Sequence, residues 1–487
     1  MDKINHLILG DNLKIMQQMS PENIDVAYLD PPFFKQYQYE AIWNDEGERR
    51  SFQEHWKGGT EQYIAWLKDR VAAVYRLLKP TGSLFLHCSL EISAAIRCQI
   101  LDNIFGLSNL RGEIIWHPEK LDSSRAQQKG LPFHSVILYY SKSNTFTSHI
   151  SSKHGTTTSV WTDIENVSVQ DKHHIGYPTQ KPITLLERII ALSSNEGQIV
   201  FDPFVGGGTT IIAAERMKRR WIGIDESVTA LKLSEMRVQR EPTTTSLPNV
   251  QIDVYDNETI RRSDPFIFER LIVEALQGRA NEQQRNDKGI DGRKKDGTLI
   301  QVKRSENIDE KVVAIFRTAL EREAKKERLQ HVPHGILAAF SFTKSAKEEV
   351  KRLQKEYGIS IELRLIKTII NVADRPSLEL MVEEITQSGK SREDARTIKG
   401  GLFEDLKEIT FIAKSIPTDE VLFYAWDFAY NGKTFCPEVF IDRRGQQQRK
   451  MKAGEYMIAV KVVHKNGLDS MIVRKLLVSD SIKIIAL

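Results

Sequence analysis

The stretch QIVFDPFVGGGTTIIAAERMKRRWIGID, residues 198–225, indicates the fold of the N-terminal half of the chain. An apolar strand pattern leads into three glycines, Gly206 to Gly208, and a helical pattern begins directly after them. Glycines at this point let the backbone turn sharply and let a ligand approach closely. A second apolar strand then ends in Asp225, where a carboxylate can bind ribose hydroxyls. The stretch therefore predicts a nucleoside-containing cofactor, and the missing third glycine of the dinucleotide fingerprint argues against NAD or FAD.

The same alternation of strand and helix patterns continues toward the N-terminus. Short apolar runs such as HLILG, DVAYL, SLFLH and VILYY are separated by helical stretches such as EQYIAWLKDRVAAVYRLLK. Alternation of this kind predicts an α/β domain with a largely parallel sheet. We place this domain at residues 1–245, because REPTTTSLPN, residues 240–249, has the composition of a linker.

Two further domains are expected after the linker. A helix pattern, DPFIFERLIVEALQG, precedes a hairpin pattern whose turn contains Asp296 and Gly297, and helices and strands then alternate. This order predicts a smaller α/β domain at residues 260–390. The segment KSREDARTIKG, residues 390–400, is charged and poor in apolar residues, which indicates another boundary. The alternating segments that follow predict a β-sandwich at residues 401–487.

The composition is that of a soluble globular protein. Of the 487 residues, 28% are charged and 40% are hydrophobic, and no apolar run approaches the length of a membrane span. The three cysteines, Cys88, Cys98 and Cys436, form no CxxC pair, which argues against a disulfide framework or a structural zinc site. The start lacks a signal-peptide layout, so we expect a cytoplasmic location. A net charge of +4 neither demands nor excludes a polyanionic partner.

A second informative stretch is LDPPFF, residues 29–34. Pro31 and Pro32 end the apolar strand before them, because proline lacks an N–H group to donate. Asp30 lies at this break, and Phe33 follows the prolines. One interpretation is a surface turn with Phe33 packed into the core, and the other is a site that needs a carboxylate and an aromatic ring together.

Several motifs in a fixed order resemble one enzyme family, the amino-methyltransferases that methylate exocyclic amines of DNA bases with S-adenosylmethionine. The tetrapeptide DPPF precedes the glycine-rich motif FDPFVGGGTT, which is similar to the order in the β subgroup. The resemblance covers nearly all of residues 1–240 and implies a Rossmann-like methyltransferase fold. Further matching motifs are LGDN (9–12), LLKPTGSLFLH (77–87), IIWHPEK (114–120) and YPTQKPITLLERII (177–190).

The resemblance assigns the catalytic step to residues 30–33. It implies that Asp30 and the carbonyl of Pro31 accept the amino hydrogens, that Pro32 helps to rigidify the turn, and that Phe33 stacks on a base flipped out of the duplex. Family members with Asp before the two prolines are mostly adenine-N6 enzymes, so we expect adenine, with cytosine N4 as the alternative. His117 resembles the position beside the flipped base, although a packed strand-end histidine explains it equally well.

The resemblance also implies a cofactor site and a target-recognition segment. The glycine loop would hold the methionine part of S-adenosylmethionine, Asp225 its ribose and Asp11 its adenine, while Thr179 and Lys181 would lie near its carboxylate. Lys181 could instead be a solvated lysine ahead of a helix. Target recognition would lie within residues 118–176. The expected cofactor residues are Asp11, Thr179, Lys181, Asp202, Phe204, Gly206, Gly208, Thr209 and Asp225.

A second candidate site lies in DKGIDGRKKDGTLIQVKRS, residues 287–305. Gln301 and Lys303 are two apart on one strand and face the same side, where they can converge with Asp291 on the neighbouring strand. A carboxylate for a divalent metal and a lysine near the attacking water suit phosphodiester hydrolysis. The pattern resembles the Mrr-like branch of the PD-(D/E)xK nucleases, which implies Mg²⁺ at Asp291, Gln301 in place of a second acid, and assistance from Glu269. The alternative is a polar hairpin with a surface lysine.

Three hypotheses follow for the whole chain. The first is an adenine methyltransferase fused to a restriction nuclease, acting on double-stranded DNA and not on a membrane. The second is a methyltransferase whose second domain only binds DNA, and the third is a non-catalytic regulator that senses S-adenosylmethionine. A homodimer is left open as the oligomeric state, and the C-terminal domain is expected to have a structural or interaction role.

Overall fold

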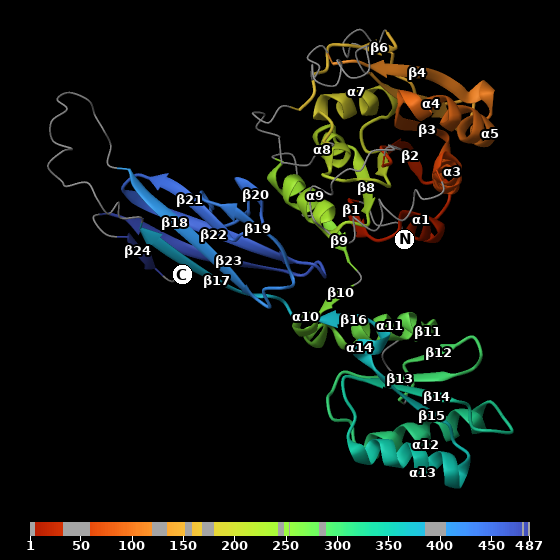
Figure 1. Ribbon diagram of the computed structural model, residues 1–487. Coiled ribbons are helices and arrows are strands. Elements are labelled where there is room, and N and C mark those ends of the chain that lie inside the picture. The colour runs from red at the N-terminus through yellow and green to blue at the C-terminus, as the bar shows by residue number, and fades with distance from the viewer. Residues whose placement is uncertain are drawn as a thin grey trace. The chain divides into compact units, whose positions relative to one another are not determined.

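A nine-stranded sheet forms the centre of the N-terminal half of the chain (Figure 1). In the computed structural model its order is β6-β4-β5-β3-β2-β7-β8-β1-β9. The neighbours β2, β7, β8 and β1 run parallel, whereas β5 is antiparallel to β3 and to β4. The strands are β1 (His6–Leu9), β2 (Ile24–Leu29), β3 (Leu78–Ser89), β4 (Leu110–Trp116), β5 (Ser135–Ser141), β6 (Val160–Trp161), β7 (Ile199–Asp202), β8 (Arg220–Asp225) and β9 (Asn249–Gln251).

The chain divides into two compact units by its internal contacts, one made of residues 1–252 and 376–487 and the other of residues 253–375.

No helix in the described part of the chain is long and apolar enough to cross a membrane. The residues described by the structure are 5–32, 59–118, 134–150, 158–167, 180–241, 248–252, 254–281, 289–384, 406–479 and 482–485.

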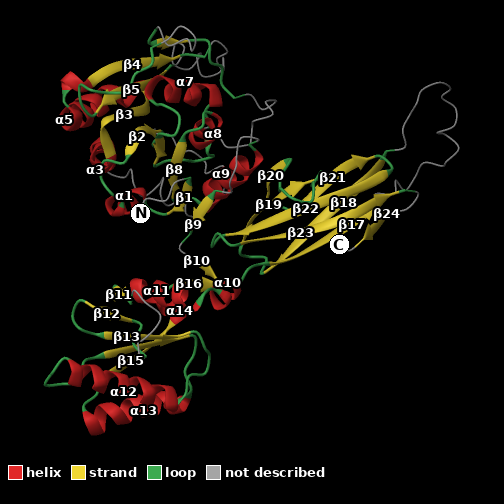
Figure 2. Cartoon of the chain, turned by 180° about the vertical axis from the view of Figure 1, so that it is seen from behind, coloured by secondary structure: helices red, strands yellow, loops and turns green. Residues whose placement is uncertain are grey.

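Helices cover both faces of the nine-stranded sheet, as Figure 2 shows. All six residues of β2 are buried, because alternate side chains enter two separate cores. Ala27 and Leu29 pack with the first set of helices, and Val26 and Tyr28 with the second. The first set is α1 (Asn12–Gln18), α3 (Gly59–Leu77), α4 (Leu90–Ile96) and α5 (Asp102–Phe105); the second is α7 (Ile183–Ser193), α8 (Thr209–Arg216) and α9 (Val228–Arg240). The predicted α/β fold is confirmed.

The second unit is built on a five-stranded sheet of order β11-β12-β13-β14-β15. β11, β12 and β13 are antiparallel neighbours, and β13, β14 and β15 are parallel. The predicted hairpin turn is present, since Gly297 has a φ of 89° and the carboxylate of Asp296 accepts a hydrogen bond from Thr298 N at 2.9 Å. The strands are β11 (Gly278–Ala280), β12 (Gly292–Lys294), β13 (Leu299–Lys303), β14 (Gly335–Ala339) and β15 (Ile361–Leu365).

Helices again pack on both faces of this sheet. Ile300 and Val302 share a core with the helix α11, whereas Leu299 packs with α12 on the opposite face. A short parallel pair, β10 (Val254–Asp256) and β16 (Asn371–Ala373), joins the two ends of the unit. The helices are α10 (Asn257–Arg262), α11 (Pro265–Ala275), α12 (Glu310–Lys326), α13 (Lys344–Tyr357) and α14 (Ile366–Ile369).

The C-terminal region contains two antiparallel sheets and, in its described part, no helix (Figure 2). Leu380 and Phe411 of one sheet pack with Trp426 and Ile458 of the other, as in a β-sandwich. The sheets are β17-β18-β21 and β20-β19-β22-β23-β24, formed by β17 (Ser377–Glu384), β18 (Lys407–Ile416), β19 (Val421–Asp427), β20 (Val439–Asp442), β21 (Gln446–Met451), β22 (Gly454–His464), β23 (Asp469–Val478) and β24 (Ile482–Ile485).

The sandwich begins earlier in the chain than the sequence patterns suggested. β17 pairs with β18 from Ser377 to Glu384, although this strand precedes the expected start at residue 401. The apolar-poor segment 390–400 therefore connects two strands of one sandwich and does not separate two domains. Within the same unit, Lys232 of α9 forms an ion pair with Asp469 of β23 at 2.6 Å.

Candidate active sites

The first candidate site lies where four parallel strands end. β2 is followed by Asp30, β7 ends at Asp202, β8 ends at Asp225, and β1 is followed after one residue by Asp11. These strands are neighbours in the order β2-β7-β8-β1, so their carboxyl ends share one edge of the sheet. Ligands of open α/β sheets bind at this edge. The predicted carboxylates are thus brought together by the fold.

Asp30 forms a close ion pair at this edge. Lys181 Nζ lies 2.5 Å from Asp30 Oδ2, and the two side chains are 11% and 18% exposed, respectively. Burial raises the pKa of Asp30, and the ammonium of Lys181 acts in the opposite direction. The sequence resemblance placed Lys181 near a cofactor carboxylate, whereas here it contacts the predicted catalytic acid. Pro31 is buried and Pro32 half-buried, and Phe33 lies outside the described residues.

A neutral polar pair lies behind Asp30. Tyr28, two residues before it on β2, makes a hydrogen bond of 2.8 Å between its hydroxyl and His87 Nδ1. Burial, and then the charge of Lys181, hold the pKa of His87 well below its usual value. Burial also raises the pKa of the Tyr28 hydroxyl, with the carboxylates of Asp30 and Asp202 adding to the effect. This wall of the site therefore carries no charge at neutral pH.

The glycine loop adopts a backbone that requires glycine. Gly206 and Gly208 have φ values of 49° and 80°, and a Cβ on Gly208 would lie 2.6 Å from Ser234 Oγ. Ser234 and Arg237 on α9 support the loop from behind. Ser234 Oγ donates to Gly206 O at 2.8 Å, and the buried guanidinium of Arg237 donates to Gly207 O. The sequence analysis did not identify either Ser234 or Arg237.

Two aspartates fix the loop from the strand ends. Asp225 accepts hydrogen bonds from Gly206 N at 2.8 Å and from Ser227 N at 2.9 Å. Asp202 is buried and accepts from Phe204 N at 2.9 Å. Burial raises the pKa of Asp202 to about 7, against hydrogen bonds from Thr210 and Phe204. The predicted residue Thr209 is buried at the start of α8, where its hydroxyl accepts from Arg237 at 3.4 Å.

Arg70 of α3 joins the LGDN motif to the glycine loop. Its guanidinium donates to Asp11 Oδ2 at 3.3 Å and to Asn12 Oδ1 at 2.8 Å, and Asn12 in turn donates to Pro203 O at 2.8 Å. The guanidinium lies 4.0 Å from the ring centroid of Trp66, which packs on Phe204 at 5.7 Å between centroids. Asp11 therefore has a fixed orientation beside the loop.

Glu226 adds a carboxylate that the motifs did not identify. It directly follows Asp225, and its pKa is raised by desolvation, then by the negative charge of Asp11 and a hydrogen bond with it. Asp11 and Glu226 thus lie near Arg70, and Asp225 lies next to Glu226. Such a set can bind the hydroxyl groups of a nucleoside.

The remaining predicted parts of the methyltransferase site are Thr179, His117 and the recognition segment 118–176. Thr179 lies outside the described residues, as do residues 119–133, 151–157 and 168–176 of the expected recognition segment. His117 is half-buried at the end of β4 and donates its backbone N–H to Trp161 O at 3.0 Å. The expected recognition segment 118–176 includes β5, a buried strand of the main sheet. A core strand therefore interrupts it.

The second candidate site lies on the hairpin of the five-stranded sheet. Asp291 is buried directly before β12, and its carboxylate accepts a hydrogen bond from Val302 N at 2.6 Å. Gln301 on β13 is only 1% exposed, and its Oε1 has no hydrogen-bond partner among the described residues. An unpaired buried oxygen is costly and marks a position where a ligand could bind. Lys303, two residues further along β13, is half-buried.

Glu269 lies on α11, which packs against the other face of the sheet. Its neighbour Phe268 shares a core with Ile300 and Val302, whereas Leu299 shares a core with α12. Because strand residues alternate in direction, Gln301 faces the α12 side with Leu299. The described residues contain no group of three or more His, Cys, Asp or Glu side chains that could hold a metal ion.

Comparisons with known proteins match the two α/β domains separately. Residues 24–236 match the family model described as DNA methylase, and residues 260–372 match the one described as restriction endonuclease. The Type II methyltransferase M2.DpnII of Streptococcus pneumoniae is 28% identical over 246 residues, which are 48% of this chain and 90% of that protein. The DNA adenine methyltransferase YhdJ of Escherichia coli is 27% identical over 260 residues, covering 48% and 82%, respectively.

A solved structure also matches part of the chain. It is the PvuII DNA methyltransferase, described as cytosine-N4-specific, with 19% sequence identity and a TM-score of 0.38. The match covers 47% of this chain and 84% of that chain.

Proposed function

We propose that this chain performs two reactions on DNA, since residues 24–236 form a DNA methylase domain and residues 260–372 form a restriction endonuclease domain. The first reaction transfers a methyl group from S-adenosylmethionine to the exocyclic N6 of adenine in double-stranded DNA. The second is Mg²⁺-dependent hydrolysis of the DNA backbone. The observation that carries the first assignment is the ion pair of Asp30 with Lys181, at the sheet edge that also holds the glycine loop.

Asp30 acts on the amino group of the target base. This nitrogen is a weak nucleophile because its lone pair is delocalised into the ring. The carboxylate of Asp30 accepts a hydrogen bond from one N–H of the amino group, and the carbonyl oxygen of Pro31 accepts a hydrogen bond from the other. These two hydrogen bonds bring the nitrogen toward tetrahedral geometry. The base reaches this position by leaving the helical stack, and Phe33 provides the surface on which it stacks. Catalysis then depends mainly on alignment and on charge.

The residues around the glycine loop fit a nucleoside cofactor. When bound, S-adenosylmethionine supplies the electrophilic methyl group. Asp225 and Glu226 would hold the ribose hydroxyls, Asp11 would lie on the adenine side, and residues 204–209 would hold the methionine part. The fit rests on the orientation of Asp225 by Gly206 N and Ser227 N, and of Asp11 by Arg70.

The hairpin site offers oxygen atoms for a magnesium ion. The carboxylate of Asp291 and the unpaired Oε1 of Gln301 are both buried, and Mg²⁺ accepts a few protein oxygens together with water. The metal would supply Lewis-acid stabilisation of the phosphate. Lys303 would orient the attacking water and balance developing negative charge. Because Glu269 lies on α11, which packs against the opposite face of the sheet from Gln301, we assign it no role in this step.

The pairing of the two activities has a physical consequence for the cell. A nuclease that cut methylated sites would destroy the DNA that its own chain had marked. We therefore propose that methylation blocks cleavage, and we place the chain with its DNA substrate in the cytoplasm. A homodimer would supply two nuclease sites, one for each strand.

The first experiment measures transfer of tritiated methyl groups to unmodified duplex DNA, followed by digestion to nucleosides. Labelled N6-methyladenine is expected with the wild-type chain and is lost with Asp30→Ala. Labelled N4-methylcytosine would show the cytosine alternative, and incorporation unchanged by Asp30→Ala would overturn the assignment of this site. No incorporation by either protein, with S-adenosylmethionine bound, would favour a sensing regulator.

The second experiment compares cleavage of unmodified and premethylated DNA with Mg²⁺. Cleavage of unmodified DNA alone is expected, with loss of activity in Asp291→Ala and Lys303→Ala. Equal cleavage of both substrates would overturn self-protection. DNA binding without cleavage under every condition would favour a domain that only binds DNA.

A further inference from the structure

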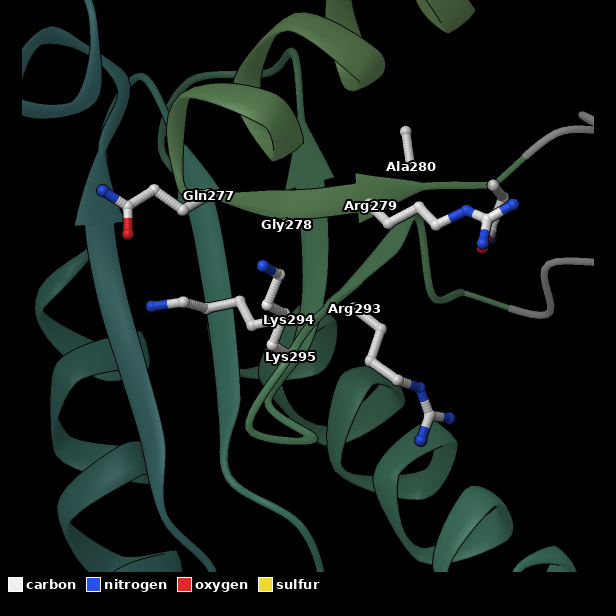
Figure 3. Close-up of a pocket in the computed structure, with 8 residues that line it drawn as sticks. Gln277, Gly278, Arg279, Ala280, Arg293, Lys294 and Lys295 are labelled. Carbon is white, nitrogen blue, oxygen red and sulfur yellow. The ribbon is translucent and has the colours of Figure 1, made fainter.

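A cationic groove lies beside the hairpin that carries Asp291 (Figure 3). It has a volume of about 720 Å³ and follows β11, an edge strand of the five-stranded sheet. The groove is lined by Gln277, Gly278, Arg279, Ala280, Asn281, Arg293, Lys294 and Lys295. Four of these eight side chains are cationic and none is acidic, aromatic or a large aliphatic group.

The charges in the groove are only partly balanced. Arg293 is paired at 2.7 Å with Glu327, which directly follows α12, and in Figure 3 it points away from Gln277, Lys294 and Lys295. Lys294 and Lys295 form no ion pair with any residue that the structure describes. Arg279 and Arg293 are direct cross-strand partners, so cationic side chains are concentrated along this edge. An anion would be attracted to such an edge.

The groove leads to the candidate catalytic acid. Asn281, at its end, donates its backbone N–H to Asp291 O at 3.0 Å and its side-chain amide to Ile290 O. Ala280 is the register partner of Gly292, the residue after Asp291. An extended polyanion in the groove would therefore continue directly to the hairpin site.

We propose that this groove binds the sugar-phosphate backbone of the DNA that the Asp291 site cleaves, so the inference rests on the proposed nuclease function. Lysine and arginine side chains without aromatic rings suit phosphate contacts, which position the duplex and carry no sequence information. The absence of rings in the lining argues against stacking of single-stranded bases. Cations on an edge strand can also serve only to prevent pairing with other strands. The following experiments separate the two explanations.

The first test measures the affinity of the full-length chain for a short fluorescent duplex at several salt concentrations, with EDTA present to prevent cleavage. In Lys294→Ala/Lys295→Ala, the slope of log K against log salt should become less negative by about 0.9 for each lost phosphate contact. The matched control is Lys347→Ala/Lys351→Ala, which removes two exposed lysines from α13. Equal slopes in the two double variants would overturn the proposal.

The second test locates the DNA, because the methylase domain also binds it. Gln277 is exposed in the groove wall, so Gln277→p-benzoylphenylalanine should form a photo-crosslink to duplex DNA. The crosslink should be lost when Lys294→Ala/Lys295→Ala is added and retained with Lys347→Ala/Lys351→Ala. No crosslink to DNA, or a crosslink to another polypeptide, would overturn the proposal.

The two proposals can fail separately in these assays. A crosslink that depends on Lys294 and Lys295, without any cleavage when Mg²⁺ is added, would support the groove and overturn the nuclease assignment. Mg²⁺-dependent cleavage without the crosslink would support the nuclease and overturn the groove.

Discussion

Lys181 Nζ lies 2.5 Å from Asp30 Oδ2, across 151 residues of sequence, at the carboxyl edge of the main sheet. Burial works against the charged form of Asp30, and the ammonium of Lys181 works in its favour. Asp30 must be ionised to accept a hydrogen bond from the amino group of the base. The ion pair therefore indicates that Lys181 keeps Asp30 in its charged form before the substrate binds. Lys181 is thus a positioning residue for the proposed methyl transfer, in addition to any contact it makes with the cofactor.

Replacing Lys181 should therefore change the pH dependence of methyl transfer. The acceptor function is present above the pKa of Asp30 and is lost as the pH falls through it. Lys181→Met removes the charge that lowers this pKa, so the acid limb of kcat/KM should move to higher pH, and Lys181→Arg should move it back. We expect the rate at neutral pH to fall on the order of 10²–10³-fold in Lys181→Met. An unmoved acid limb with weakened S-adenosylmethionine binding, measured by calorimetry, would instead place Lys181 with the cofactor.

Asp202 should make the methylase domain less stable as the pH rises. Burial raises its pKa from the ordinary 3.8 to about 7 in the folded chain. The folded state then binds more protons than the unfolded state between these values, so stability is greatest at the acid end and falls as the pH approaches 7. Asp202→Asn lacks this titration, and its Tm relative to wild type should rise across pH 5 to 7. A Tm difference that stays constant over this range would contradict the raised pKa.

The strand-end acids and the glycine loop could be predicted from sequence because each lies in a local pattern that switches from strand to turn. The side chains that support the loop could not be predicted in this way. Arg70, Ser234 and Arg237 contact the loop or its neighbours only after α3 and α9 pack on the sheet. For Arg70 the sequence contains a weak signal, because this cation lies between Leu67 and Val71 on the buried face of an otherwise amphipathic helix.

Two long-range contacts were not visible in the local patterns. The motif predicts Lys181 near a cofactor carboxylate, and the structure shows in addition that Lys181 pairs with Asp30. The strand at Ser377–Glu384 precedes a charged segment, and only its pairing with β18 shows that it belongs to the sandwich. Long-range pairing of this kind leaves little trace in local composition.

Gly208→Ala should lower the free energy of unfolding by more than the cost of placing an alanine at a positive φ. An alanine with φ near 80° costs about 1–2 kcal/mol, and here its Cβ would also lie 2.6 Å from Ser234 Oγ. Gly197→Ala is the matched control, since Gly197 has a φ of 77° and open space around its Cβ position. We expect Gly208→Ala to lose about 1–3 kcal/mol more than the control, seen as a lower Tm in calorimetry. Equal stability losses in the two variants would show that the Ser234 side chain can move aside at no cost in free energy.

Gln301→Glu should make the stability of the nuclease domain depend on metal. Gln301 is 1% exposed and its Oε1 has no partner among the described residues, so a carboxylate there would be buried without compensation. Without metal we expect a lower Tm than wild type, and with Mg²⁺ a recovery, because the ion would pair with this carboxylate and with Asp291. Gln354→Glu, the same change at an exposed position on α13, should lose little and should respond to Mg²⁺ no more than wild type does. If Mg²⁺ leaves the Tm of Gln301→Glu unchanged, the metal does not bind between Asp291 and residue 301, and hydrolysis at this hairpin would need another source of ligands.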